Sequence, residues 1–174
     1  DSVLLYDQLV KTYHDQNDFS AEQEALTKRL ALGEASATHY RLGLLLTLSD
    51  VQHAQQEFNT ASSLDPEFKL VTTTLLFALN AAESEPDPAR RYVIIGRGLG
   101  LVEEWGLASK AFEHALSLDG ANADAWAWLG EARQHQGQDG SEELDKALSF
   151  DSGDPIVHAL RGLYWTRMGK YSNA

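Results

Sequence analysis

Six histidines are the residues of this sequence with the clearest capacity for metal binding or acid–base chemistry. They are His14, His39, His53, His114, His135 and His158. None of them forms a His-x-x-x-His pair or a zinc-protease motif. The chain has no cysteine, which excludes a thiol nucleophile, a disulfide framework and Cys-ligated zinc. We therefore expect no metal centre, with a site assembled across the fold as the minor alternative.

Three further motifs have residue types that could bind phosphate, calcium or a proton. The glycines at 96, 98 and 100 lack the sixth-position glycine, the preceding strand and the following Lys-Ser/Thr of a phosphate loop. The segment 119–124 has the wrong acidic spacing for an EF-hand. The adjacent glutamates at 103–104 and 142–143 would not face each other on a helix. We therefore predict no cofactor and no enzyme activity.

Charge and hydropathy exclude two classes of partner. The 174-residue chain has 14 Lys and Arg against 26 Asp and Glu, a net charge of −12. Binding to nucleic acid requires clustered cations facing phosphate, so we predict no nucleic-acid partner. The longest uncharged apolar stretch is 70–82, which is shorter than the ~20 residues that span a bilayer. No membrane span is predicted in this segment.

The elements that must position any site follow an internal repeat of about 34 residues. Each unit predicts two helices, roughly 89–103 and 106–118 in the unit that begins at Ala89. Small residues recur at the eighth and twentieth positions, where they would let the two helices approach closely. These residues are Gly43, Gly96, Gly130 and Gly162 at the eighth position, and Ala54, Ala108 and Ala174 at the twentieth.

Local signals support helices throughout the chain. Ser20 and Ser49 each precede a glutamine by three residues, which predicts a capping box at the start of a second helix. Asp87 and Asp154 each precede a proline, as an N-cap residue does when proline occupies the first helical position. No alternating apolar and polar run is long enough for a strand. The predicted fold class is therefore all-α.

The pattern resembles the tetratricopeptide repeat, most clearly at residues 111–120 preceded by Tyr92, Gly96 and Leu99. The resemblance implies an α-solenoid, a right-handed superhelix of antiparallel helix pairs, with residues 1–174 as one domain. Its units are about 3–35, 36–68, 89–122 and 123–154, with an irregular segment at 69–88 and a partial unit at 155–174.

The resemblance also implies a concave groove lined by the first helix of each pair. The groove residues that we select as candidate partner-binding residues are Lys11, Tyr40, Leu44, Arg90, Arg97, Glu131 and His135. Solvated helix charge is the alternative for the two arginines, and packing between repeats is the alternative for Tyr40. The family's carboxylate clamp, a Lys–Asn pair at positions 5 and 9, does not occur here.

The function that this resemblance implies is a non-catalytic scaffold that binds a protein or peptide ligand in the groove. The alternative is a recognition or assembly segment of a larger enzyme or membrane-associated machine. The last unit would leave one apolar face open, and we expect further repeats, another chain or self-association to cover it.

Overall fold

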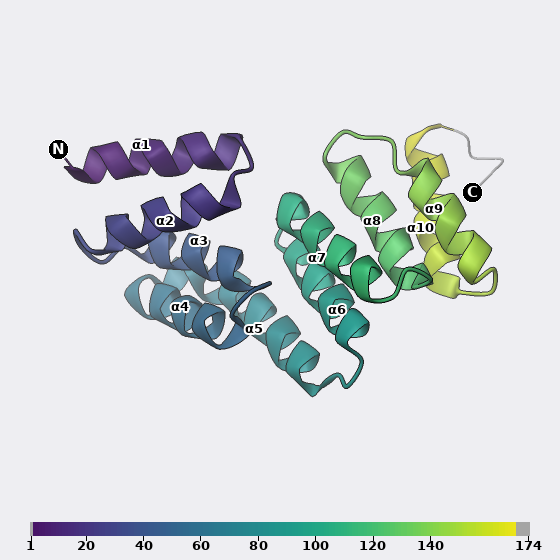
Figure 1. Ribbon diagram of the computed structural model, residues 1–174, viewed down its shortest axis with the longest axis horizontal. Helices are drawn as coiled ribbons and strands as arrows, with labels where there is room; N and C mark the ends of the chain where they lie inside the picture. The colour runs from purple at the N-terminus through teal and green to yellow at the C-terminus, as the bar shows by residue number, and fades with distance from the viewer. Residues whose placement is uncertain (1, 170–174) are drawn as a thin grey trace. The chain divides into compact units, whose positions relative to one another are not determined.

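A computed structural model describes residues 2–169, and in this range the chain forms helices and no strand (Figure 1). The helices are α1 (Ser2–Asp15), α2 (Phe19–Leu30), α3 (Ser36–Leu46), α4 (Val51–Leu64), the 3-10 helix η1 (Pro66–Phe68), α5 (Lys69–Ser84), α6 (Pro88–Leu101), α7 (Trp105–Leu118), α8 (Ala123–His135), α9 (Ser141–Phe150) and α10 (Pro155–Arg167). The chain divides into two compact units, Asp1–Leu79 and Asn80–Ala174, and the division falls within α5.

The first unit contains two helix pairs. Helix α1 packs on α2 and α3 packs on α4, and α2 also contacts α3 (Figure 1). Phe58 of α4 is fully buried. A methyl group added at Gly43 of α3 would stand 2.7 Å from Cε1 of Phe58. The glycine is therefore what allows this phenylalanine ring to lie against the backbone of the first helix.

The second unit repeats this arrangement. Helix α6 packs on α7, α8 packs on α9, and α7 also contacts α8 (Figure 1). A methyl group at Gly96 of α6 would stand 2.5 Å from Cε1 of Phe112, which is fully buried in α7. In the next pair, Gly130 of α8 meets the backbone of Gly140. Gly140 is therefore the small residue at the close approach of this helix pair.

Helix α10 differs from the other first helices. It contacts α8 and α9, but no atom lies within 4 Å of a methyl group added at Gly162. Leu163 and Met168 are 47% and 54% exposed. Among residues 2–169, α10 therefore has no second helix against its glycine. The remainder of the predicted partial unit, including Ala174, lies outside the described residues.

The predicted N-terminal caps are correct for α6 and α10 and wrong for α2 and α4. Asp87 and Asp154 cap α6 and α10 as predicted, each accepting two backbone N–H bonds. The predicted capping boxes at Ser20 and Ser49 are wrong. The caps there are Asp18, which accepts from Ala21 N, and Asp50, which accepts from His53 N. A carboxylate stabilises the positive end of the helix dipole more strongly than a hydroxyl does.

The structure confirms the all-α fold class built from paired helices. The irregular segment 69–88 holds α5, which contains the apolar stretch 70–82. Among the described residues, no helix is both long enough and apolar enough to cross a bilayer. The organisation of residues 1–174 as one continuous domain stays a prediction.

Candidate functional site

A pocket of about 550 Å³ opens on the second unit. It is formed by the C-terminal end of α6, the turn that follows, the first residue of α7 and one face of α8. Its lining residues are Arg97, Gly100, Leu101, Glu103, Trp105, Trp128 and His135. Two of them, Arg97 and His135, are among the candidates that the sequence analysis selected.

The turn between α6 and α7 shapes one end of the pocket. The N–H groups of Glu103 and Glu104 donate to the carbonyls of Gly100 and Leu99, and Glu103 adopts a left-handed φ of 65°. The chain therefore reverses tightly and brings Trp105 back across α6. A methyl group at Gly100 would stand 2.8 Å from Cζ3 of Trp105, so this close approach depends on glycine.

Stacked rings close the far wall of the pocket. The rings of Trp105 and His135 lie with their centroids 3.8 Å apart and their planes at 9°. The next residue, Gln136, donates from Nε2 to the carbonyl of Trp105 and to Oγ of Ser109, at 3.3 and 2.6 Å. These bonds fix the end of α8 against the start of α7 and thereby hold the stack in place.

Arg97 is the cation of the pocket, and it has no carboxylate partner within residues 2–169. Its Cζ lies 5.1 Å from the ring centroid of Trp128, a cation–π distance. Among the described residues, no carboxylate comes within 4.0 Å of Arg97 or of Arg90, seven residues earlier on α6. Five other cations of the same unit do form such pairs: Lys110, Arg133, Lys146, Arg161 and Arg167.

Two polar atoms on α8 are buried next to this cation without a hydrogen-bond partner among residues 2–169. They are Oδ1 of Asp124 and the indole Nε1 of Trp128. Burial raises the pKa of Asp124, and the charge of Asp154 raises it further, while Arg97 and Arg90 oppose the shift. A buried polar atom without a hydrogen bond lowers the stability of the folded protein. These two atoms therefore mark a place where hydrogen bonding is incomplete.

Glu131 of α8 contacts one residue of its own helix, His135, and one of α10, Arg167. Its side chain is 6% exposed and accepts two hydrogen bonds from Arg167 of α10, at 2.6 and 2.7 Å. Nε2 of His135 lies 3.1 Å from the same carboxylate. The bond to Glu131 raises the pKa of Arg167. Glu131 therefore joins α8 to α10 and orients His135, and its own oxygens are occupied.

The three candidates of the first unit do not form a comparable site. Lys11 is exposed on α1. Tyr40 is half-buried, with its ring centroid 6.0 Å from that of Phe58 and 5.1 Å from that of Phe68. Leu44 is fully buried at 0% exposure, so its side chain offers no surface to a ligand. Tyr40 and Leu44 lie in the packing of the first unit.

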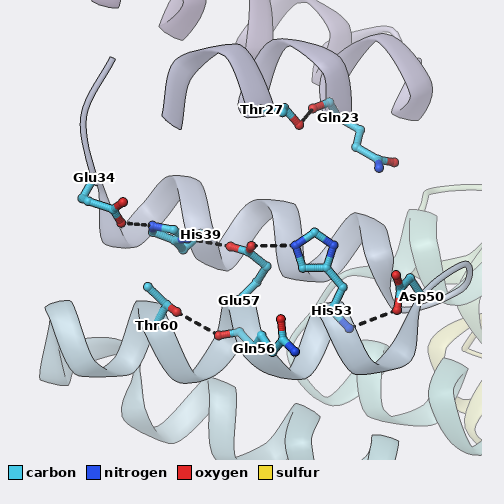
Figure 2. Close-up of polar contacts among 9 residues, drawn as sticks. All are labelled: Gln23, Thr27, Glu34, His39, Asp50, His53, Gln56, Glu57 and Thr60. Atoms are coloured by element: carbon cyan, nitrogen blue, oxygen red, sulfur yellow. Dashed lines mark hydrogen bonds and ion pairs between the residues drawn. The ribbon is translucent and has the colours of Figure 1, made fainter. Parts of the chain in front are cut away.

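The first unit also holds a histidine–carboxylate cluster, drawn in Figure 2. His39 of α3 lies 2.6 Å from Oε2 of Glu57 and 2.5 Å from Oε2 of Glu34, while His53 lies 3.0 Å from the other oxygen of Glu57. Burial lowers the pKa of His39, but the bonds to Glu57 and Glu34 outweigh it and the pKa is raised. Within residues 2–169, no group of three His, Cys, Asp or Glu has metal-binding geometry.

Four residues that define the pocket and its support are not among the predicted groove residues: Leu101, Trp105, Trp128 and Arg167. Trp128 was recognisable as the one tryptophan off the repeat's aromatic positions, and the spacing of Asp124, Trp128, Glu131 and His135 places them on one face of α8. Trp105 falls on an aromatic position of the repeat, which by itself indicates core packing. Leu101 and Arg167 had no signal in the sequence, because their roles depend on the turn after α6 and on how α10 meets α8.

Comparisons with known proteins find similar structures but no similar sequence family. No family model matches the chain, and no curated protein matches it. A crystal structure of MamA is 21% identical, with a TM-score of 0.44, covering 95% of this chain and 87% of that one. MamA 41-end from Desulfovibrio magneticus RS-1 is 19% identical, with a TM-score of 0.45, covering 99% and 88%.

A third structure is that of YrrB, described as a TPR protein with an unusual peptide-binding site. It is 17% identical, with a TM-score of 0.44, covering 88% of this chain and 89% of that one. The helix pairs and the glycine contacts of this chain define its class on their own. That class is an all-α helical repeat whose units resemble the tetratricopeptide repeat.

Proposed function

We propose that this protein is a non-catalytic scaffold that binds a protein or peptide segment in the pocket formed by α6, α7 and α8. The observation that carries the proposal is the pocket itself, which combines an exposed apolar residue, two tryptophans and a cation that pairs with no carboxylate in the described part of the chain. Leu101, on its rim, is 76% exposed. Concave sites of this volume with a few placed polar groups are typical binding sites.

The scaffold around the pocket supports a binding role. Trp105 is fixed by Gly100 and Gln136, and His135 is fixed by the stack and by Glu131. A wall that is already ordered loses little conformational entropy when a ligand binds. Large aromatic residues and arginine are also the residue types that contribute most at protein interfaces.

Selection from a random library of displayed 12-residue peptides on the purified chain tests this function. We expect binders whose affinity falls at least tenfold in the Leu101→Asp variant, because a charge would then stand in the apolar rim. Leu118→Asp is the matched control, since Leu118 is 57% exposed on α7 and does not line the pocket. Equal binding by both variants would place the ligand on another face.

We propose as the second candidate that the chain is a recognition or assembly segment of a larger complex. The open face of α10, with Gly162 uncontacted and Leu163 and Met168 exposed, favours it. Self-association is one way to cover this face. Light scattering over a range of concentrations should then show a mass increase that the Leu163→Glu variant lacks, whereas a constant monomer mass for the unaltered chain would exclude self-association.

A further inference from the structure

We infer that the ligand of this pocket is an acidic peptide segment, in which a carboxylate pairs with Arg97 and a neighbouring large apolar side chain enters the pocket. The inference rests on the proposed function and specifies its ligand. It follows from the charge, the exposure and the geometry of α6 and α8.

The charge of the site favours an anionic ligand. Arg97 and Arg90 lack a carboxylate within 4.0 Å among the described residues, although the chain as a whole has 26 acidic residues. They are seven residues apart on α6 and therefore lie on the same helix face. At a rise of about 1.5 Å per residue they are separated by about 10 Å, which matches about three residues of an extended peptide. A second acidic residue at that spacing would meet Arg90.

Among the described residues, no acidic group of the site forms a close ion pair with either arginine. Asp124 is partly buried, and burial raises its pKa although Arg97 and Arg90 act in the opposite direction. Glu131 is occupied by Arg167 and His135. Glu103 lines the pocket but forms no ion pair with Arg97 among residues 2–169. Arg97 is exposed, with its guanidinium over the ring of Trp128, and it can donate two hydrogen bonds to the oxygens of one carboxylate.

The apolar part of the pocket favours a large side chain beside the carboxylate. Leu101 and the rings of Trp105 and Trp128 line the pocket together with Arg97. A carboxylate on Arg97 would therefore bring the next side chains of the same segment against these three residues. An aromatic or long aliphatic residue would bury the exposed surface of Leu101, and burial of apolar area is the main source of affinity at such a contact.

Peptides selected from the random library test the inference in two steps. We expect enrichment of Asp or Glu within four positions of Trp, Phe or Leu. For one such 12-residue peptide, we expect Arg97→Gln to weaken binding about tenfold, and the peptide's own Asp→Asn or Glu→Gln change to do the same. In the doubly changed pair the two losses should not add, because both remove one ion pair.

Two controls separate this ion pair from a general charge effect. Lys110→Gln removes the same charge from an exposed lysine on α7 and should alter affinity less than twofold. Raising the salt concentration should weaken binding to the unaltered chain more than to the Arg97→Gln variant. Equal losses in the Lys110 and Arg97 variants would contradict the inference.

The outcomes also distinguish this inference from the proposed function. Binders that depend on Leu101 but carry Lys, Arg or no charge would overturn the inference and leave the function standing. Additive losses in the double-mutant cycle would overturn it in the same way. A library that yields no Leu101-dependent binder would overturn both.

Discussion

The glycines at the eighth position of each unit provide a graded test of how the helices pack. Gly96 and Gly162 occupy equivalent positions in first helices, but only Gly96 faces a buried ring. A methyl group at Gly96 would stand 2.5 Å from Phe112, while nothing lies within 4 Å of one at Gly162. Phe112 is fully buried, so a shift of its ring would have to take place within the core. Gly96→Ala and Gly162→Ala should therefore differ in stability.

The expected difference follows from two opposing terms. Replacing glycine by alanine within a helix stabilises it by about 1 kcal/mol, and this gain is common to both variants. Overpacking a filled core costs about 1–3 kcal/mol, and only Gly96→Ala incurs this cost. Gly162→Ala should raise the free energy of unfolding, and Gly96→Ala should lie about 1–3 kcal/mol below it.

Urea denaturation followed by helical circular dichroism measures this difference. The two variants carry the same chemical change in the same type of helix, so each serves as the reference for the other. Equal unfolding midpoints with unchanged slopes would refute the packing of α6 against α7 described above. A Gly96→Ala variant that is the more stable of the two would refute it as well.

Three other predictions concern electrostatics and capping. The raised pKa of His39 means that its stabilising contribution is complete below its unfolded pKa of about 6.5 and is lost as pH rises through the higher folded value. The difference in stability between the unaltered chain and His39→Gln should therefore narrow as pH rises above about 6.5. A difference that widens with pH would contradict the ion pairs with Glu34 and Glu57. Arg167→Gln should lower the free energy of unfolding by about 1–3 kcal/mol, because its partner Glu131 is buried. Arg161→Gln should lower it by at most about 0.5 kcal/mol, because its partner Asp145 is exposed. Similar losses for the two variants in urea titrations would argue against the ion pair between Arg167 and Glu131. In the same assay, Asp50→Ala should lower the free energy of unfolding by about 1 kcal/mol and Ser49→Ala by less than about 0.5 kcal/mol, because Asp50 caps α4. The reverse order would indicate that Ser49 is the cap.

The sequence was sufficient to predict the helix pairs because their signals are local and repeated. The glycine and alanine positions, the 3.6-residue apolar periodicity and the Asp-Pro caps each depend on neighbours along the chain. The two misassigned caps show the limit of such signals. Asp18 and Asp50 lie within two residues of the predicted serines, and the choice between adjacent acceptors depends on where the turn ends.

The candidate site was predictable only in part. The position of a residue in the repeat predicts which face of its helix it lies on, but not which residues surround it. Arg97 and His135 line the pocket, but Leu44 is buried and Glu131 is engaged by Arg167. The partner of Glu131 lies 36 residues further along the chain, so no local pattern indicates it. The same holds for Trp105, which reaches the pocket through the left-handed turn at Glu103.

The indole N–H signals of the four tryptophans give the most direct test of where a ligand binds. Trp105 and Trp128 line the pocket, whereas Trp126, whose Nε1 donates to the carbonyl of Gly120, and Trp165 do not. In a 15N-labelled chain titrated with a selected acidic peptide, the signals of Trp105 and Trp128 should shift while those of Trp126 and Trp165 stay in place. Shifts confined to Trp126 and Trp165 would contradict the assignment of the pocket as the binding site.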